Sequence, residues 1–270
     1  LILLAPGLRA GEKPAEDSRK LTVMLDWFVN PDHAALVVAQ EKGFFAAHDL
    51  EVELQTPADP NDPPKLVAAG KVDLAVSYQP QVHIHVNAGL PIKRVGTLVA
   101  TPLNSLMVLK NGPVKTLADL KGRKIGYSVG GFEEALLKAL LARANLKSED
   151  VTLVNVNFAL SPALLSGQVD AVIGAFRNFE LNQMDLMKKP GRAFYPEEEG
   201  VPPYDELVLV AARDKLKDPR LARFMDALEQ ATLYLLNHPD EAWKAFIARH
   251  KDLDDELNRR AWRDTLPRLA

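Results

Sequence analysis

The 270-residue sequence contains no cysteine. Disulfide bonds, thiolate metal ligands and cysteine nucleophiles are therefore excluded, and an oxidising compartment is compatible with this absence. Basic residues are not in excess either, because 33 lysines and arginines face 36 aspartates and glutamates, for a net charge of −3. We expect no nucleic-acid partner, since such a partner requires a basic face. After the N-terminal segment, no apolar run reaches the length of about 20 residues that spans a bilayer.

The N-terminal segment has two parts. Leu1 to Ala10 is mostly apolar, and the charged stretch Gly11 to Lys20 follows it. This order resembles the end of a signal peptide followed by the tail of a mature exported protein, and an ordinary frayed terminus is the alternative. We therefore expect residues 1–20 to be a signal-peptide remnant and tail. We also expect the protein to be periplasmic or otherwise extracytoplasmic, either free or tethered to a membrane.

The rest of the chain alternates short apolar segments with segments of helical spacing, which predicts an α/β fold. With 47% apolar residues, a chain of this length can bury a large core. Residues 69–76 and 166–173 resemble each other, and each places a glycine turn before a buried strand. We therefore expect two similar α/β lobes. Residues 219–269 are helical by pattern, and their Trp243 and Trp262 are expected in the core.

The turn after the first predicted strand is the most informative stretch. Pro31 fixes one backbone angle, and Asn30 or Asp32 can cap the helix that begins there. Trp27 and Phe28 add flat apolar surface beside the free N–H groups of that helix. Such a turn can stack a planar heterocycle and orient it with a few hydrogen bonds. A tryptophan at such a junction is also often a core residue, so a ligand site and a core turn are both open interpretations.

Two more segments place polar groups at predicted strand ends. Ser77, Tyr78 and Gln79 follow a buried strand, and ligands of parallel sheets gather at the carboxyl ends of strands. The Gly130-Gly131 turn precedes a helix and can bring backbone N–H groups to a polar ligand. It lacks the third glycine of the dinucleotide fingerprint and the lysine of a P-loop, so it is not a nucleotide signature.

Glu180 follows another buried strand, in a segment that also contains Phe176, Asn178 and Phe179. A carboxylate among aromatic rings is stable if it meets an amine or a ring N–H, and costly if it stays unpaired. An exposed glutamate at the start of a helix is the alternative.

No spacing in the chain indicates a metal site or a nucleophile. His83 and His85 are two residues apart on a predicted helix and face different sides. A Gly-x-Ser-x-Gly elbow is missing. We expect no metal, no cofactor and no catalytic residue.

Five segments together resemble the thiamine-pyrimidine-precursor family. They are Asp26-Trp27, Asn30-Pro31-x-His33, the run from Val38 to Phe45, the run from Gly70 to Leu74 and the run from Leu120 to Gly126. The family includes bacterial periplasmic proteins that bind formylaminopyrimidine or hydroxymethylpyrimidine for ABC import, and the fungal pyrimidine synthase. The resemblance covers the chain from about Leu21 to Val210.

The resemblance implies a type II periplasmic-binding-protein fold, in which two α/β lobes joined by two crossings close over the ligand. We place the crossings near 109–112 and 205–207. Lobe 1 would then be discontinuous, comprising residues 21–109 and 207–270, and lobe 2 would comprise residues 110–206.

The resemblance also implies which residues face the cleft. These are Trp27, Asn30, His33, Ser77, Tyr78, Gln79, Gly130, Gly131, Phe132, Asn178, Glu180 and Tyr204. Glu180 would accept a hydrogen bond from the amino group of the pyrimidine ligand, and aromatic rings would enclose the heterocycle. The implied partners are an ABC permease and an ATPase, and we expect the binding protein to be a monomer.

The sequence departs from the fungal synthase at the positions that carry its chemistry. That enzyme uses a lysine for pyridoxal phosphate and a histidine four residues later, and the matching positions here are Ser77 and Gln81. Its cysteine-rich iron motif cannot exist in a chain without cysteine, so transport is favoured over synthesis. A riboflavin precursor is an alternative ligand. A sulfonate or nitrate would require a cation such as Arg177, which Glu180 opposes. A sensor module is a further alternative.

Overall fold

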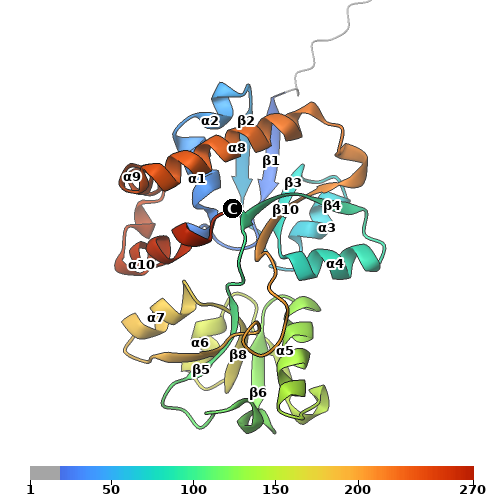
Figure 1. The fold of residues 1–270 in the computed structure, drawn as a ribbon, viewed down its shortest axis with the longest axis vertical. Helices are drawn as coiled ribbons and strands as arrows, with labels where there is room; N and C mark the ends of the chain where they lie inside the picture. Colours follow the sequence, from blue (N-terminus) through green and yellow to red (C-terminus); the bar gives the residue numbers. More distant parts are fainter. Residues whose placement is uncertain (1–18) are drawn as a thin grey trace, which may run out of the picture.

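The computed structural model describes residues 19–270, which form two α/β lobes along the long axis of the molecule (Figure 1). Each lobe is built around a five-stranded sheet, so the expectation of two similar α/β lobes is confirmed. The expected signal-peptide remnant and most of the expected tail lie outside the described residues.

The sheet of lobe 1 is mixed. Its strands are, in the order in which they pair, β2 (Glu51–Gln55), β1 (Lys20–Met24), β3 (Leu74–Ser77), β10 (Leu207–Ala212) and β4 (Ile92–Val99). β1 runs parallel to β2 and β3, whereas β10 runs antiparallel to β3 and β4. The late strand β10 therefore returns to the first lobe, as expected from the assignment of residues 207–270 to lobe 1.

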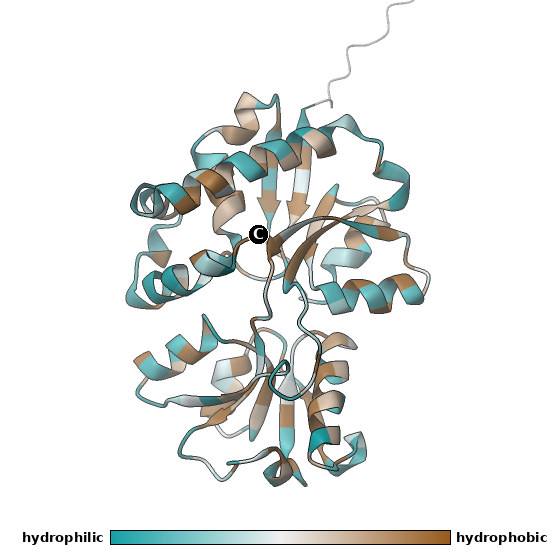
Figure 2. Ribbon diagram, viewed as in Figure 1, coloured by the Kyte–Doolittle hydropathy of each residue, from teal (hydrophilic) through white to brown (hydrophobic). Residues whose placement is uncertain are grey.

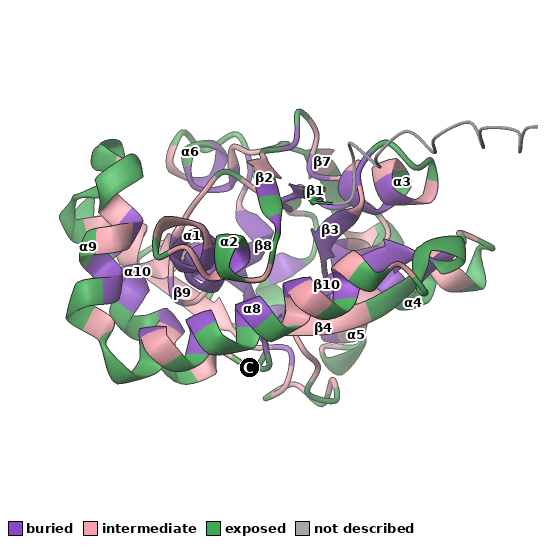
Figure 3. Cartoon of the chain, turned by 90° about the horizontal axis from the view of Figure 1, so that it is seen from above, coloured by how far each residue is buried: buried purple, intermediate pink, exposed green. Residues whose placement is uncertain are grey.

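Helices cover both faces of this sheet. They are the 3₁₀ turn η1 (Pro31–His33), α1 (Ala34–Glu41), α2 (Phe44–Ala47), α3 (Pro63–Ala68), α4 (Gln79–Asn87), α8 (Pro219–Asn237), α9 (Pro239–Arg249) and α10 (Glu256–Thr265). α1 packs against α8 and α9, and it is buried from Ala34 to Ala39. α8 exposes one side and buries the other, as the view from above shows (Figure 3). Because α8 and α9 cover it, α1 can be apolar on all sides.

The sheet of lobe 2 has the same plan. Its strands pair in the order β7 (Thr152–Asn155), β6 (Lys124–Tyr127), β8 (Ala171–Phe176), β5 (Asn104–Leu109) and β9 (Gly191–Phe194). The helices of this lobe are α5 (Phe132–Arg143), α6 (Leu160–Leu165) and α7 (Glu180–Leu186), with the 3₁₀ turns η2 (Leu117–Leu120) and η3 (Ser148–Asp150). In both lobes the strands are mostly hydrophobic and the outer helices carry hydrophilic residues (Figure 2). Strand β9 has no counterpart in the elements predicted from the sequence.

The first crossing between the lobes lies at residues 100–103 and not at the expected 109–112. β4 belongs to the sheet of lobe 1, but β5 pairs with β8 and β9 in lobe 2. The Asn-Gly-Pro signal at 111–113 marks a turn inside lobe 2, where the Gly112 N–H donates to the Leu109 carbonyl oxygen at 2.9 Å. Residues 104–109 therefore belong to lobe 2, and the second crossing, 195–206, ends where the sequence places it.

The similarity between 69–76 and 166–173 has a structural counterpart. Oδ2 of Asp73 accepts a hydrogen bond from the Thr22 N–H at 2.8 Å, on the first strand of lobe 1. Oδ2 of Asp170 accepts one from the Lys124 N–H at 2.9 Å, on β6 of lobe 2. In each lobe the aspartate thus ties the start of the central strand, β3 or β8, to the neighbouring parallel strand, β1 or β6.

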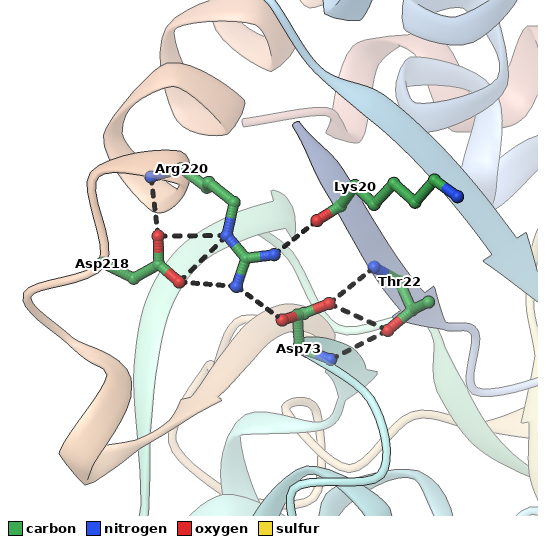
Figure 4. Close-up of polar contacts among 5 residues, drawn as sticks. All are labelled: Lys20, Thr22, Asp73, Asp218 and Arg220. Atoms are coloured by element: carbon green, nitrogen blue, oxygen red, sulfur yellow. Dashed lines mark hydrogen bonds and ion pairs between the residues drawn. The ribbon is translucent and has the colours of Figure 1, made fainter. Parts of the chain in front are cut away.

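In lobe 1 this aspartate is also part of an ionic network (Figure 4). Nη2 of Arg220, near the start of α8, lies 2.9 Å from Asp73 Oδ1 and 2.6 Å from Asp218 Oδ2. The same guanidinium donates to the carbonyl oxygen of Lys20. The network fixes the start of α8 against the edge of the β1–β3 pair.

The late helices pack as the sequence predicts. Trp243 and Trp262 are both buried, their ring centroids are 5.2 Å apart, and Phe246 packs against both. They are core residues of lobe 1. Within residues 19–270, no helix is both long enough and apolar enough to cross a membrane.

Candidate ligand-binding site

A cavity lies between the two lobes. Lobe 1 contributes Asp26, Trp27, Asn30, Asp32 and Tyr78 to its wall. Lobe 2 contributes Glu133, Leu160, Gly174, Phe176, Phe179 and Glu180. The empty space between these side chains is about 410 Å³, including the part that is open to solvent.

The turn after β1 forms the wall on the lobe 1 side. Asn30 Oδ1 accepts from the Asp32 N–H at 2.8 Å and Pro31 occupies the first helical position, so the predicted cap is confirmed. The backbone N–H of Asn30 donates to His33 Nδ1 at 3.3 Å. The proton of the neutral imidazole is therefore on Nε2, which donates to Asp26 Oδ1 at 2.8 Å.

Asp26 is held on both of its oxygens. His33 donates to Oδ1, and the Tyr78 hydroxyl donates to Oδ2 at 2.8 Å. All three side chains are buried. The acidic group at the wall of the cavity is thus fixed by two donors from lobe 1, which compensate the cost of burying a carboxylate.

The wall on the lobe 2 side carries two more carboxyl groups. Oε2 of Glu180 accepts from the Phe176 N–H at 2.7 Å, and Oε2 of Glu133 accepts from the Ser128 N–H at 2.7 Å. Gly174 lies directly against Glu133 and has a φ of +103°. A Cβ atom at Gly174 would lie 2.3 Å from Glu133 Oε1. Only glycine therefore leaves Glu133 in this position.

Four carboxyl groups and no lysine or arginine line the cavity within the described residues. Burial is the main cause that raises the pKa of Asp32 to about 6, of Glu180 to about 7 and of Glu133 to about 8. Arg177 lies outside the lining, where its Nη1 is 2.6 Å from Glu197 Oε1 and its guanidinium covers the Tyr195 ring. The lining therefore offers carboxyl oxygens to a cationic or N–H-rich ligand and no cationic side chain to an anion.

Of the residues assigned to the cleft from the sequence, four line the cavity: Trp27, Asn30, Tyr78 and Glu180. Two others contact lining residues but do not line the cavity themselves. His33 holds Asp26, and Phe132 stacks on Tyr78 with 5.1 Å between ring centroids.

The remaining assigned residues lie away from the lining. The Ser77 hydroxyl donates to Gln81 Oε1 at 2.8 Å, and Gln79 Oε1 accepts from the Asp205 N–H at 2.7 Å. Tyr204 packs edge-on against Phe132, with ring centroids 6.2 Å apart.

The predicted Gly130-Gly131 turn and Asn178 make contacts between the lobes. The Gly130 N–H donates to Asn61 Oδ1 of lobe 1 at 2.7 Å, and the Gly131 position lies near Ile84 of α4. Asn178 Nδ2 donates to Asp32 Oδ1 at 2.6 Å. These residues join the lobes and do not line the cavity.

The sequence-based assignment leaves out several lining residues. They are Asp26, Asp32, Glu133, Leu160, Gly174, Phe176 and Phe179. Asp26 belongs to the opening motif, and Phe176 and Phe179 closely precede Glu180, so proximity in sequence was an available signal for these three. Glu133 offers no such signal, because a glutamate in the first turn of a helix is ordinarily a solvated residue. Across the described chain, no group of three or more histidines and carboxylates is arranged to hold a metal ion.

The NMT1/THI5-like family model matches residues 30–242. The chain belongs to this family. A Haemophilus influenzae protein named for thiamine biosynthesis is 59% identical over 258 residues, which cover 95% of this chain and 82% of the relative. A formylaminopyrimidine-binding protein of Halalkalibacterium halodurans is 36% identical, covering 87% of this chain and 71% of the relative. A Saccharomyces cerevisiae 4-amino-5-hydroxymethyl-2-methylpyrimidine phosphate synthase is 28% identical, covering 88% of this chain and 74% of the relative.

Among solved structures, the alkanesulfonate-binding protein SsuA of Xanthomonas axonopodis pv. citri is similar, with a TM-score of 0.74. The match covers 96% of this chain and 86% of that chain at 20% identity. The similarity concerns the fold. Together with the two sheets, which the chain connects by two crossings, it confirms the expected type II periplasmic-binding-protein fold.

Proposed function

We propose that the chain is the extracytoplasmic substrate-binding protein of an ABC importer, and that it binds a thiamine pyrimidine precursor between its lobes. The candidate ligands are hydroxymethylpyrimidine and formylaminopyrimidine. The relatives named for thiamine biosynthesis and for formylaminopyrimidine binding support this proposal. By the same reasoning, the partners are a permease and an ATPase, and the binding protein acts as a monomer.

One observation carries the choice of ligand: the cavity combines aromatic rings with carboxyl groups and has no cationic side chain among its lining residues. An aminopyrimidine is flat, donates hydrogen bonds from its amino group and accepts a proton on its ring. Trp27 and Phe176 offer apolar faces for the ring, and Glu180 offers an acceptor for the amino group. A sulfonate or nitrate would meet four carboxyl groups and no lysine or arginine among the lining residues, so the proposal does not favour these ligands.

The enzyme alternative is less favoured, although relatives named as synthases belong to the same family. Ser77 and Gln81 stand at the positions that match the lysine and histidine of the fungal synthase. Neither side chain carries an amine that could form a Schiff base. Both are buried and hydrogen-bonded to each other, so they have a structural role in lobe 1.

Calorimetric titration tests the proposal. The purified protein is titrated with hydroxymethylpyrimidine, formylaminopyrimidine, taurine and riboflavin. We expect one pyrimidine to bind with one site per chain, and taurine not to bind. Glu180→Gln should weaken pyrimidine binding by about tenfold or more, because a charged hydrogen bond is lost. The matched control is Asp185→Asn, an exposed acidic residue on the same helix. Binding of taurine or riboflavin in place of a pyrimidine would contradict the proposal.

A further inference from the structure

Asp32 connects the two lobes through one of its carboxylate oxygens. The side chain is 2% exposed. Its Oδ1 accepts from Asn178 Nδ2 at 2.6 Å and lies 3.0 Å from the Thr265 hydroxyl. Asn178 belongs to lobe 2, between β8 and α7, and Thr265 ends α10 of lobe 1. α10 and α7 lie next to each other on the same side of the molecule (Figure 1). We name Asp32, Asn178 and Thr265 the clasp.

The other oxygen of Asp32 has no partner. Oδ2 is buried and makes no hydrogen bond, and Asp32 is part of the cavity lining. A buried carboxylate oxygen without a donor is costly, and a ligand N–H at this point removes that cost. Burial raises the pKa of this carboxyl group to about 6, so the group is largely ionised at neutral pH.

We propose that Asp32 is a ligand-binding residue that couples occupation of the cavity to closure of the lobes. The ligand is a planar compound with an N–H donor, such as an exocyclic amine or an amidinium. Its N–H donates to Oδ2, so both carboxylate oxygens of Asp32 have donors when the lobes are closed. Without the ligand, closure of the lobes buries Oδ2 with no donor, which costs free energy and favours separation of the lobes. The inference depends on the proposed function only for the identity of the first probe.

Another interlobe hydrogen bond provides the control. Asn182 Nδ2 of α7 donates to Asp264 Oδ2 of α10 at 2.8 Å. Like the bond between Asn178 and Asp32, it joins an asparagine of lobe 2 to an aspartate of lobe 1, but neither residue lines the cavity. Asn182 also donates to the Asn178 carbonyl oxygen at 2.9 Å, so the control substitution is made at Asp264. A bond that only holds the lobes together should behave like the bond to Asp264, and a bond that also senses the ligand should not.

The experiment measures closure and affinity in the same variants. Because the chain has no cysteine, Lys189→Cys on lobe 2 and Lys251→Cys on lobe 1 give one spin-label pair at exposed positions. We expect saturating hydroxymethylpyrimidine to shorten the label distance in the labelled parent. Asp32→Asn should weaken binding by about tenfold or more, and Asn178→Ala by about fivefold, with closure lost in both. Asp264→Ala, the control, should bind and close like the parent.

The outcomes separate the two proposals. If Asp32→Asn and Asn178→Ala behave like Asp264→Ala, the coupling is overturned while pyrimidine binding stands. If the parent binds no pyrimidine, the proposed function fails, and benzamidine, a planar cation, replaces the probe. Closure with benzamidine that disappears in Asp32→Asn and Asn178→Ala supports the coupling. Absence of closure with either probe overturns it. Circular dichroism of each variant confirms that a loss of closure is not a loss of folding.

Discussion

The Tyr78 hydroxyl donates a hydrogen bond of 2.8 Å to Asp26 Oδ2, and both side chains are almost completely buried. Tyr78→Phe keeps the ring that stacks on Phe132 but leaves one oxygen of Asp26 without its donor. We expect the free energy of unfolding to fall by about 1–3 kcal/mol, as measured by urea denaturation, and ligand affinity to fall with it. Tyr234→Phe, which removes an exposed hydrogen bond to Glu241, should change stability by less than about 0.5 kcal/mol. Equal effects of the two substitutions would show that Asp26 does not depend on Tyr78.

Glu206 ties the two crossings together. It lies at the end of the second crossing, and its Oε2 accepts from the N–H groups of Leu103 at 2.6 Å and of Asn104 at 2.9 Å, at the first crossing. Glu206→Ala leaves two buried donors without an acceptor and should lower the free energy of unfolding by about 2–4 kcal/mol. Glu206→Gln keeps an acceptor oxygen and should cost less. Urea denaturation measures the free energy of unfolding of both variants. Equal losses of stability would show that the hydrogen bonds from Leu103 and Asn104 are not the cause.

Gly174 controls the position of Glu133. Gly174→Ala forces a side chain onto a backbone with φ +103° and places its Cβ against Glu133 Oε1. Gly89 also has a positive φ, +90°, but its Cβ position is open. Gly89→Ala therefore measures the backbone strain alone, of about 1 kcal/mol. We expect Gly174→Ala to destabilise more than Gly89→Ala and to abolish ligand binding in calorimetry, while Gly89→Ala binds normally. If Gly174→Ala bound the ligand normally, the assignment of Glu133 to the binding site would be wrong.

The stability of the ligand-free protein should depend on pH in a specific direction. The pKa of Glu133 is raised from 4.5 to about 8, and the pKa values of Glu180 and Glu206 are raised to about 7. Between pH 4.5 and about 8, the native state thus binds more protons than the unfolded state. The contribution of these groups is fully present below pH 4.5 and is lost as the pH rises through 7 and 8. Urea denaturation at pH 5, 6, 7 and 8, roughly spanning this window, should show falling stability.

A single variant isolates the largest of these shifts. Glu133→Gln cannot ionise, so its stability should fall less between pH 7 and 8 than that of the parent, roughly the interval in which Glu133 titrates. Stability that rises from pH 6 to 8 in the parent would mean that the buried carboxyl groups are not protonated in the folded state, contrary to the stated pKa shifts.

Much of the fold could be predicted from the sequence because its signals are local. The glycine turns before buried strands predict the two lobes, and the helical spacing of residues 219–269 predicts the outer helices. The first crossing was misplaced because Asn-Gly-Pro at 111–113 is a strong turn signal. Residues 100–103 carry a weaker signal, with Pro102 as the one turn-forming residue among them. Strand β9 was missed because its four residues, GRAF, have neither alternation nor a long apolar run.

The candidate site was predictable only where function and local pattern coincide. Trp27, Asn30, Tyr78 and Glu180 lie at strand ends and line the cavity. Glu133 was missed because it is buried against Gly174, on strand β8 of the same lobe. Asp32 was missed because its partner Asn178 lies in the other lobe, 146 residues away in the sequence. No spacing in a single sequence encodes such a contact.

Native mass spectrometry of the protein in an equimolar mixture of hydroxymethylpyrimidine, formylaminopyrimidine, taurine and riboflavin tests the central claim most directly. The acidic, aromatic cavity predicts a one-to-one complex with a pyrimidine, and loss of that complex in Glu180→Gln but not in Asp185→Asn. A complex with taurine or riboflavin, or a pyrimidine complex that survives Glu180→Gln unchanged, would contradict the account.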